Sequence, residues 1–243
     1  MTPEELQELK ESGVLLVDKP AEWTSHDVVG CIRGRFRFHK VGHCGTLDPA
    51  ATGLLVVVLG KATRLSDRLS GQDKVYAGTF RLGVETDSQD RDGKVTRTTD
   101  ASPVTAAAVT AAAAKFVGDL QQIPPMVSAI KVDGRPLYKL ARKGQEIARE
   151  PRPVTIHHLT LTRIAIPDVE FEVACSKGTY VRTLAADIGA ALGVGAHLRE
   201  LRRLQSGAFK VADAVTMDTV KGWTREQCLA HMIPIASLVP YLK

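Results

Sequence analysis

Short apolar segments recur along the chain and are separated by polar turns. Each is a run of strand length bounded by turn residues, which is the pattern of a strand. In one of them Phe80 and Leu82 alternate with Thr79 and Arg81, so one face of that strand is expected to be buried. The predicted strands fall at residues 14–18, 54–59, 75–84, 154–164 and 169–175.

Helical patterns lie between these segments. Residues 2–5 predict the capped start of a short surface helix, and Thr24 with Asp27 resembles a capping box for a second helix. The alanine-rich stretch 105–117 has high helix propensity, and 179–192 has apolar residues at helical spacing. Strands and helices do not alternate regularly, so we expect an α+β or mixed-sheet domain and not a doubly wound fold.

Composition adds modest constraints. The 243 residues carry 32 Lys and Arg against 27 Asp and Glu, a net charge of +5 that permits nucleic-acid binding without requiring it. No apolar run approaches the ~20 residues that span a bilayer, and the N-terminus lacks a secretory pattern. The four cysteines form no CxxC pair. We therefore expect a cytoplasmic protein with reduced thiols and no membrane association.

One segment, residues 121–153, stands apart from the predicted sheet. Prolines punctuate both of its ends, and residues 137–143 could form a short helix inside it. The segment is either a solvated surface loop or a basic arm inserted into the main sheet. Its seven cations are Lys131, Arg135, Lys139, Arg142, Lys143, Arg149 and Arg152.

The loop around Asp48 is the strongest candidate for chemistry. Asp-Pro is a common turn dipeptide, so a structural aspartate is the first interpretation. However, Asp48 lies in a glycine-bearing loop beside His43 and leads into an apolar strand that can hold it rigidly. A carboxylate held in this way can act as a nucleophile or a base. His39, His43 and Cys44 have poor spacing for zinc, so we expect no metal site.

Three further stretches combine basic and apolar residues. Residues 33–40 interleave arginines with Phe36 and Phe38, which fits RNA binding or a strand with phenylalanines inward and arginines outward. Residues 175–182 predict a strand end, a glycine turn and a helix start, with Arg182 free to pair with a carboxylate or to lie on the surface. In 197–204 the leucines could pack inward while the arginines face solvent or phosphate.

Taken in order, these segments resemble the TruB family of bacterial tRNA pseudouridine-55 synthases along nearly the whole chain. The resemblance is carried by ordered motifs and not by one isolated match. They are residues 15–20 (LLVDKP), 42–49 (GHCGTLDP), 60–64 (GKATR), 74–76 (KVY), Thr86-Asp87 with Asp90 and Gly93, 122–129 (QIPPMVSA), 175–182 (CSKGTYVR) and 201–204 (LRRL).

The resemblance implies a pseudouridine synthase fold: a mixed, largely antiparallel sheet flanked by helices, with residues 121–153 as a basic thumb. It also implies residue roles. Asp48 matches the catalytic aspartate, Tyr76 the tyrosine that packs on the target base, and Arg182 the arginine paired with the carboxylate. The matched substrate-binding positions are His43, Tyr180, Leu201, and Lys19 with Pro20, whose motif supports the active-site loop in the family.

The resemblance further implies a guide-independent isomerase that acts on uridine 55 of the tRNA T-stem-loop, with no cofactor, no metal and no obligatory protein partner. We expect a monomer. We treat 1–243 as one catalytic domain, because the roughly 40 residues after Leu204 leave no room for the PUA-type domain of many relatives. Two other hypotheses stay open: a tRNA chaperone without essential catalysis, and a guide-dependent synthase. A hydrolase using Asp48 with Asp87 or Asp90 is a further alternative.

Overall fold

A computed structural model describes residues 2–128, 131–132, 135–136 and 147–242. Within it the chain forms two compact units, 1–76 with 201–243, and 77–200. Strands β4 (Lys74–Leu82) and β12 (Ala196–Ser206) contribute residues to both units. No helix in the described ranges is long and apolar enough to cross a membrane. Lys139, Arg142, Lys143 and the helix predicted for 137–143 lie outside the described residues.

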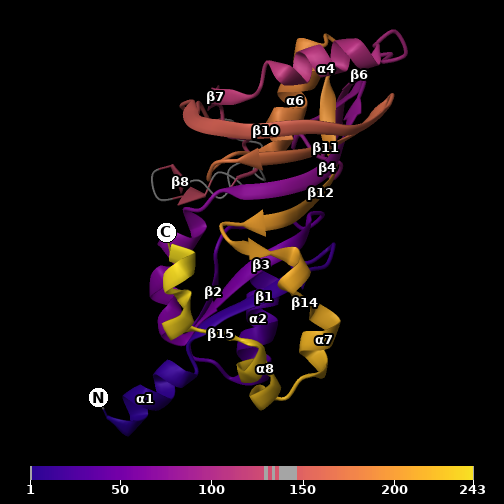
Figure 1. Ribbon diagram of the computed structural model, residues 1–243. Coiled ribbons are helices and arrows are strands. Elements are labelled where there is room, and N and C mark those ends of the chain that lie inside the picture. Colours follow the sequence, from indigo (N-terminus) through magenta and orange to yellow (C-terminus); the bar gives the residue numbers. More distant parts are fainter. Residues whose placement is uncertain (1, 129–130, 133–134, 137–146, 243) are drawn as a thin grey trace. The chain divides into compact units, whose positions relative to one another are not determined.

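The first unit is built on the strand order β14-β1-β3-β12, with β15 on β1, β2 on β3 and β13 on β12 (Figure 1). Strand β1 pairs antiparallel with β3 and parallel with β14, while β3 pairs parallel with β12. Its elements are α1 (Pro3–Lys10), β1 (Gly13–Lys19), α2 (Ser25–Phe36), β2 (Val41–His43), β3 (Thr52–Leu59), η1 (Gly60–Leu65), α3 (Ser66–Ser70), β13 (Phe209–Lys210), η2 (Val211–Asp213), β14 (Val215–Thr216), α7 (Met217–Gly222), α8 (Arg225–His231), β15 (Ile233–Pro234) and η3 (Ile235–Leu242).

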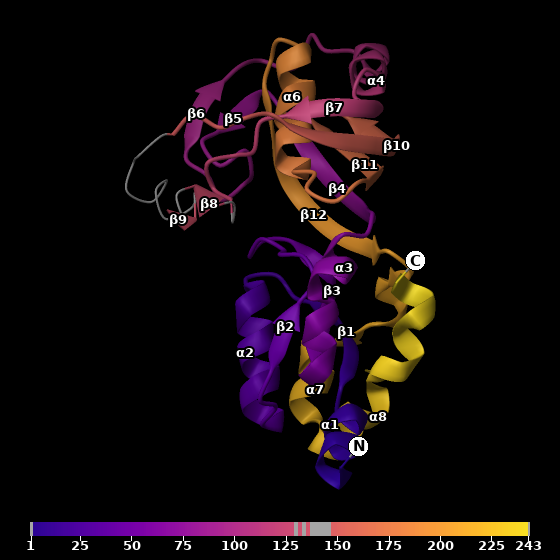
Figure 2. The ribbon, with the colours of Figure 1, turned by 90° about the vertical axis from the view of Figure 1, so that its left-hand side faces the viewer.

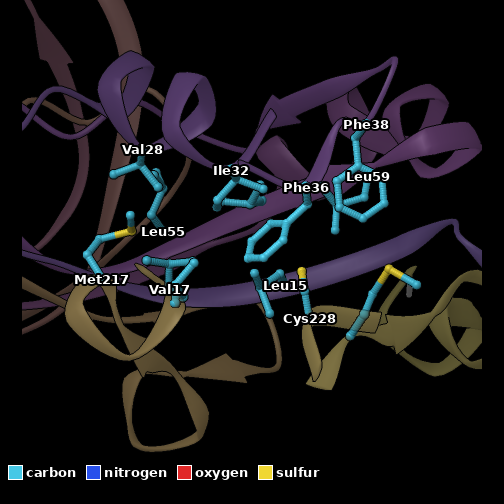
Figure 3. Close-up of a cluster of buried hydrophobic side chains, with 13 residues drawn as sticks. Leu15, Val17, Val28, Ile32, Phe36, Phe38, Leu55, Leu59, Met217 and Cys228 are labelled. Carbon is cyan, nitrogen blue, oxygen red and sulfur yellow. The ribbon is translucent and has the colours of Figure 1, made fainter. Parts of the chain in front are cut away.

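Both faces of this sheet are covered, which explains why β1 and β3 are almost continuously apolar. On one face, Val28, Ile32 and Phe36 of α2 point toward Leu15 of β1 and Leu55 of β3 (Figure 3). The alternate residues of the same strands join a second buried cluster on the other face. That second cluster includes Val14, Leu16, Leu54, Val56 and Val58.

Local sequence signals account for how these elements begin. Thr2 and Thr24 each form a complete capping box with Glu5 and Asp27, so both predicted helix starts are confirmed. Gly53 allows the close approach of β3 to β12. Its φ is +97°, and a Cβ there would lie 2.3 Å from the carbonyl oxygen of Arg203.

The second unit follows the strand order β12-β4-β11-β10-β7, and β10 pairs antiparallel with both β11 and β7. Helix α4 packs against α6 and β10 (Figure 2), and α6 contributes to an apolar pocket lined also by Phe80 and Phe171 of the sheet. Its elements are β5 (Val84–Thr86), β6 (Val95–Thr98), α4 (Ala106–Ala114), β7 (Gly118–Gln122), β8 (Lys131–Val132), β9 (Arg135–Pro136), β10 (Arg152–Ala165), β11 (Asp168–Cys175) and α6 (Val181–Ala191).

The predicted α+β class with a mixed sheet is confirmed, and each predicted strand is present. The strand interpretation of residues 33–40 was wrong. Helix α2 continues to Phe36 and Arg37 then takes a left-handed conformation, with φ of 54°. Phe36 and Phe38 are nevertheless both buried, because the chain turns between them toward the same core.

Candidate functional site

The loop that carries Asp48 connects β2 to β3 in the first unit. Asp48 is half-buried, and its carbonyl oxygen accepts from the backbone N–H of Ala51 at 3.1 Å. The preceding residue, Leu47, is bonded to Ser25 of α2 through both of its backbone polar groups. The Leu47 N–H donates to the Ser25 hydroxyl at 2.9 Å, and that hydroxyl donates to the Leu47 carbonyl at 3.2 Å. The backbone before Asp48 is therefore attached to a helix.

The backbone after Asp48 is attached to the end of β1. The carbonyl oxygen of Pro49 accepts from the Lys19 ammonium at 3.1 Å and from the Glu22 N–H at 2.9 Å. Lys19 is completely buried, and it also donates to the carbonyl oxygens of Pro20 and Trp23 at 2.8 and 2.6 Å. Burial lowers the pKa of Lys19 to about 8, while the charge of Asp48 acts in the opposite direction.

Arg203 of β12 fixes the start of the same loop. Its side chain is buried at 1% exposure and donates to the carbonyl oxygens of Leu54 at 2.6 Å and Gly45 at 3.1 Å. Gly45 has a φ of +95°, and a Cβ there would lie 3.2 Å from a guanidinium nitrogen of Arg203. The backbone conformation at this position favours glycine, and a side chain there would also press closely on the guanidinium.

His43 and Cys44 open the loop and show no sign of a metal site. Burial, and then the positive charge of Arg203, lower the pKa of His43. Burial also raises the pKa of Cys44 to about 11, so it stays a protonated thiol at neutral pH. Among the described residues, no three His, Cys, Asp or Glu side chains are arranged to hold a metal ion. His43 is the last residue of β2, and the loop that carries Asp48 begins directly after it.

Arg182, in the first turn of α6, belongs to the second unit and is held there by three acceptors. It donates to a carboxylate oxygen of Asp90 at 3.0 Å, and to the carbonyl oxygens of Val127 at 2.9 Å and Ser88 at 3.3 Å. Only 5% of Arg182 is exposed, so the interpretation of a surface arginine was wrong. A guanidinium has five donors in a planar fork, which suits it to several acceptors at once.

Tyr180 lies at the N-cap of the same helix, beside the end of β7. The amide of Gln122 donates to the Tyr180 carbonyl at 3.1 Å and accepts from the Tyr180 N–H at 2.7 Å. Gln122 is the last residue of β7 and is buried. The reciprocal pair ties the start of α6, and with it Arg182, to the end of β7.

The remaining predicted site residues lie on strands or strand ends. Tyr76 is a buried residue of β4, and Leu201 is a half-buried residue of β12 two positions before Arg203. Pro20 follows β1 directly and accepts from Lys19 through its carbonyl oxygen. The structure thus gathers Lys19, Pro20, His43 and Asp48 around one loop of the first unit, and Tyr180 with Arg182 at one helix start of the second.

Sequence reasoning missed three of the residues that build these two places: Ser25, Gln122 and Arg203. Arg203 is also a correction, because we expected the arginines of 197–204 to face outward and Arg203 is buried. Arg199 and Arg202 are half-exposed, and Arg202 is bonded to Asp18 at 2.9 and 2.7 Å. In strand β12 neighbouring residues face opposite sides, so one of two adjacent arginines had to point inward. No local signal marks Ser25 or Gln122.

Comparison with protein-family models gives two matches. Residues 33–181 match the N-terminal domain of TruB family pseudouridylate synthases, and residues 182–239 match a C-terminal domain of tRNA pseudouridylate synthase B. A curated relative, tRNA pseudouridine synthase B of Opitutus terrae, is 51% identical over 94% of this chain and 95% of its own length. The protein of the same name from Burkholderia pseudomallei is 50% identical over 93% of this chain and 75% of its own length.

Solved structures give a similar result for the fold. A chain in the crystal structure of a Cbf5–Nop10–Gar1 complex has a TM-score of 0.75 and 30% identity over 99% of this chain. A chain in the archaeal box H/ACA sRNP Nop10–Cbf5 complex has a TM-score of 0.71 and 28% identity. This chain spans 64% of the length of each of those two chains.

Proposed function

The chain belongs to the TruB family of pseudouridylate synthases, and on that premise we propose that it converts uridine 55 of the tRNA T-loop to pseudouridine without a guide RNA. Its class of activity is that of a tRNA pseudouridine synthase, an isomerase. Identity near 50% to tRNA pseudouridine synthases B, against 30% to a chain of a Cbf5 complex, favours the guide-independent enzyme over the guide-dependent class.

The reaction asks little of the protein beyond one ionised carboxylate and a pocket. It breaks the N1–C1′ bond, turns the uracil and joins C5 to C1′. C5 loses a proton and N1 gains one, so nothing is oxidised and no group is donated. The base must first leave its stack, which costs a few kcal/mol. Asp48 then either attacks C1′ and displaces N1, to be displaced in turn by C5, or removes the proton on C2′ to give a glycal and returns it when C5 joins C1′. Either role requires its ionised form.

We assign the remaining roles by matching residues to the family motif. Arg182 supplies the positive charge that keeps Asp48 ionised, and Tyr76 packs on the uracil. His43 fills the stack that the base leaves, while Tyr180 and Leu201 contact the substrate.

The observation that carries the proposal is the attachment of the Asp48 loop on both sides. Lys19 bonds to Pro49 directly after Asp48, and Arg203 bonds to Gly45 three residues before it. Both are buried cations that donate to backbone carbonyls and not to carboxylates, so their positive charge is not cancelled by those bonds. A carboxylate on such a loop is pre-organised, and the charge of Lys19, which interacts with that of Asp48, favours its ionised form.

The test is pseudouridine formation by the protein alone on unmodified tRNA, mapped by carbodiimide-blocked primer extension. We expect product at position 55, and none from Asp48→Asn, which keeps the size of the side chain and removes its charge. The matched control is Asp67→Asn, an exposed aspartate of α3, which should keep full activity.

The same experiment separates the alternatives. If Asp48→Asn keeps tRNA affinity within a few-fold but makes no product, a chaperone without essential catalysis is excluded. Release of free uracil would favour a hydrolase, and a requirement for added guide RNA would favour the guide-dependent class. Full activity of Asp48→Asn would overturn the assignment of Asp48.

Beyond the activity, we propose that the protein works as a cytoplasmic monomer on the T-stem-loop, with residues 1–243 as the catalytic domain. The cations of the thumb would neutralise tRNA phosphates, so binding should weaken as salt rises.

A further inference from the structure

Ser25 makes an unusual use of its hydroxyl group for a residue at the start of a helix. It is 2% exposed, and its two hydrogen bonds both go to Leu47, which is 22 residues away and 3% exposed. The hydroxyl accepts from the Leu47 N–H at 2.9 Å and donates to the Leu47 carbonyl at 3.2 Å. These are two bonds from one atom to both backbone polar groups of a single residue.

The helix does not need this hydroxyl in order to begin. Thr24 is the N-cap of α2, and it accepts from the backbone N–H of Asp27 at 3.0 Å. The Asp27 carboxylate in turn accepts from the Thr24 N–H at 2.8 Å, which completes the capping box. Ser25 is therefore available to hold the loop, while Thr24 alone caps the helix.

The bonds to Leu47 fix the peptide group from which Asp48 starts. The Leu47 carbonyl and the Asp48 N–H belong to one planar unit, so fixing that oxygen fixes the plane on the N-terminal side of Asp48. Pro49 restricts the backbone of Asp48 from the other side, since the helical region is disfavoured for a residue before proline. With both constraints on the backbone, the Asp48 carboxylate changes position mainly by rotation about its side-chain bonds.

From this geometry we propose that Ser25 is a positioning residue for Asp48: it holds the Leu47–Asp48 peptide in the orientation that catalysis requires. The proposal rests on the proposed function, because it concerns how Asp48 reaches the sugar. Ser25 does not touch substrate in this scheme, so its removal should lower the rate of the chemical step and leave tRNA binding unchanged. Displacement of a reacting group by about 1 Å can cost on the order of 100-fold in rate.

The experiment compares Ser25→Ala with Thr24→Ala, its neighbour in sequence. Single-turnover pseudouridine formation is measured at saturating enzyme, together with tRNA affinity and thermal midpoint. We expect Ser25→Ala to be roughly 10- to 100-fold slower with affinity within about twofold of wild type. Thr24→Ala removes the helix cap, so it should lower the thermal midpoint while its rate stays within about twofold. Ser25→Thr, which keeps the hydroxyl, should be faster than Ser25→Ala.

Each contrary result has a distinct meaning. A rate for Ser25→Ala within about twofold of wild type, with Asp48→Asn inactive, would overturn the positioning role and leave the proposed function intact. An equal loss of rate in Thr24→Ala would assign the effect to helix stability and also overturn it. If folded Ser25→Thr were no faster than Ser25→Ala, the hydroxyl would not be the cause. A wild-type protein that makes no pseudouridine would overturn both proposals.

Discussion

The buried ammonium group of Lys19 donates to the carbonyl oxygen of Pro49, the residue that follows Asp48, at 3.1 Å. Thirty residues separate the two in sequence, so this bond joins the end of β1 to the loop between β2 and β3. The other two donors of the ammonium go to Pro20 and Trp23. All three acceptors are uncharged, which makes Lys19 a support for backbone and not half of an ion pair.

Replacement of Lys19 by Met should destabilise the first unit. The apolar stem is kept, but three partly buried carbonyl oxygens lose the ammonium donor, and a single buried group left unsatisfied costs about 1–3 kcal/mol. The matched control is Lys61→Met, because Lys61 makes a surface ion pair with Glu8 at 3.1 Å, a kind of contact worth about 0–1 kcal/mol. Urea denaturation gives both values. Equal losses in the two variants would contradict the structural role of Lys19.

Arg203 and Arg202 are adjacent arginines with different surroundings, and their Met variants should differ accordingly. Arg203→Met leaves the Leu54 and Gly45 carbonyls without their donor and should cost about 1–3 kcal/mol. Arg202→Met breaks a half-exposed pair with Asp18 and should cost about 1 kcal/mol or less. Because Gly45 opens the Asp48 loop, Arg203→Met should also slow single-turnover product formation more than Arg202→Met. The opposite order in either measurement would refute this distinction.

The first unit shows what could be predicted from sequence and what could not. The helix starts at Thr2 and Thr24 were predictable, because both residues of a capping box lie within four consecutive positions of the sequence. Strand β3 was predictable from its apolar run. In contrast, the partner of Arg203 at Gly45 is 158 residues away, and that of Ser25 is 22 residues away. A polar side chain can be recognised as a buried support for the backbone only when the group that it bonds to is known. No local sequence pattern identifies a partner so far away along the chain.

The strand predicted for residues 33–40 was wrong for a different reason. Phe36 and Phe38 are both buried, and spacing of two residues is the period of a strand. The same spacing arose because helix α2 ends between them and Arg37 adopts a positive φ. Two buried positions are too few to distinguish the two-residue period of a strand from a turn of the chain at the end of a helix. For the site, the Asp48 loop was found by its composition and by family resemblance, while its support was found only in three dimensions.

His43 should make the stability of the first unit depend on pH. Burial and the charge of Arg203 lower the pKa of His43 in the folded state below the unfolded value of about 6.5. Between these two values the unfolded chain binds more protons than the folded one, so stability rises with pH in that window and is lost as pH falls through about 6.5. His43→Asn should reduce this dependence. Urea midpoints at pH 7.5 and 5.5 test the difference. The expectation fails if wild type and variant lose the same amount.

Gln122 supports backbone groups in the second unit, as Lys19 and Arg203 do in the first. The side chain of Tyr180, the N-cap residue, makes no capping hydrogen bond to α6. The side-chain amide of Gln122 instead bonds the Tyr180 carbonyl at 3.1 Å and the Tyr180 N–H at 2.7 Å. Gln122→Leu keeps the volume of the side chain but leaves the partly buried Tyr180 N–H without its acceptor, so it should cost about 1–3 kcal/mol. The Tyr180 carbonyl still accepts from the Leu184 N–H at 3.1 Å in the variant.

The matched control for this variant is Gln121→Leu, whose parent side chain is exposed on the same strand and should be replaceable at a cost within about 0.5 kcal/mol. Since Arg182 lies in the first turn of α6, Gln122→Leu should also slow product formation, and urea denaturation with single-turnover assays measures both effects. A variant that is destabilised but fully active would show that Gln122 supports the helix without setting the position of Arg182. Normal stability would show that water or another group replaces the amide.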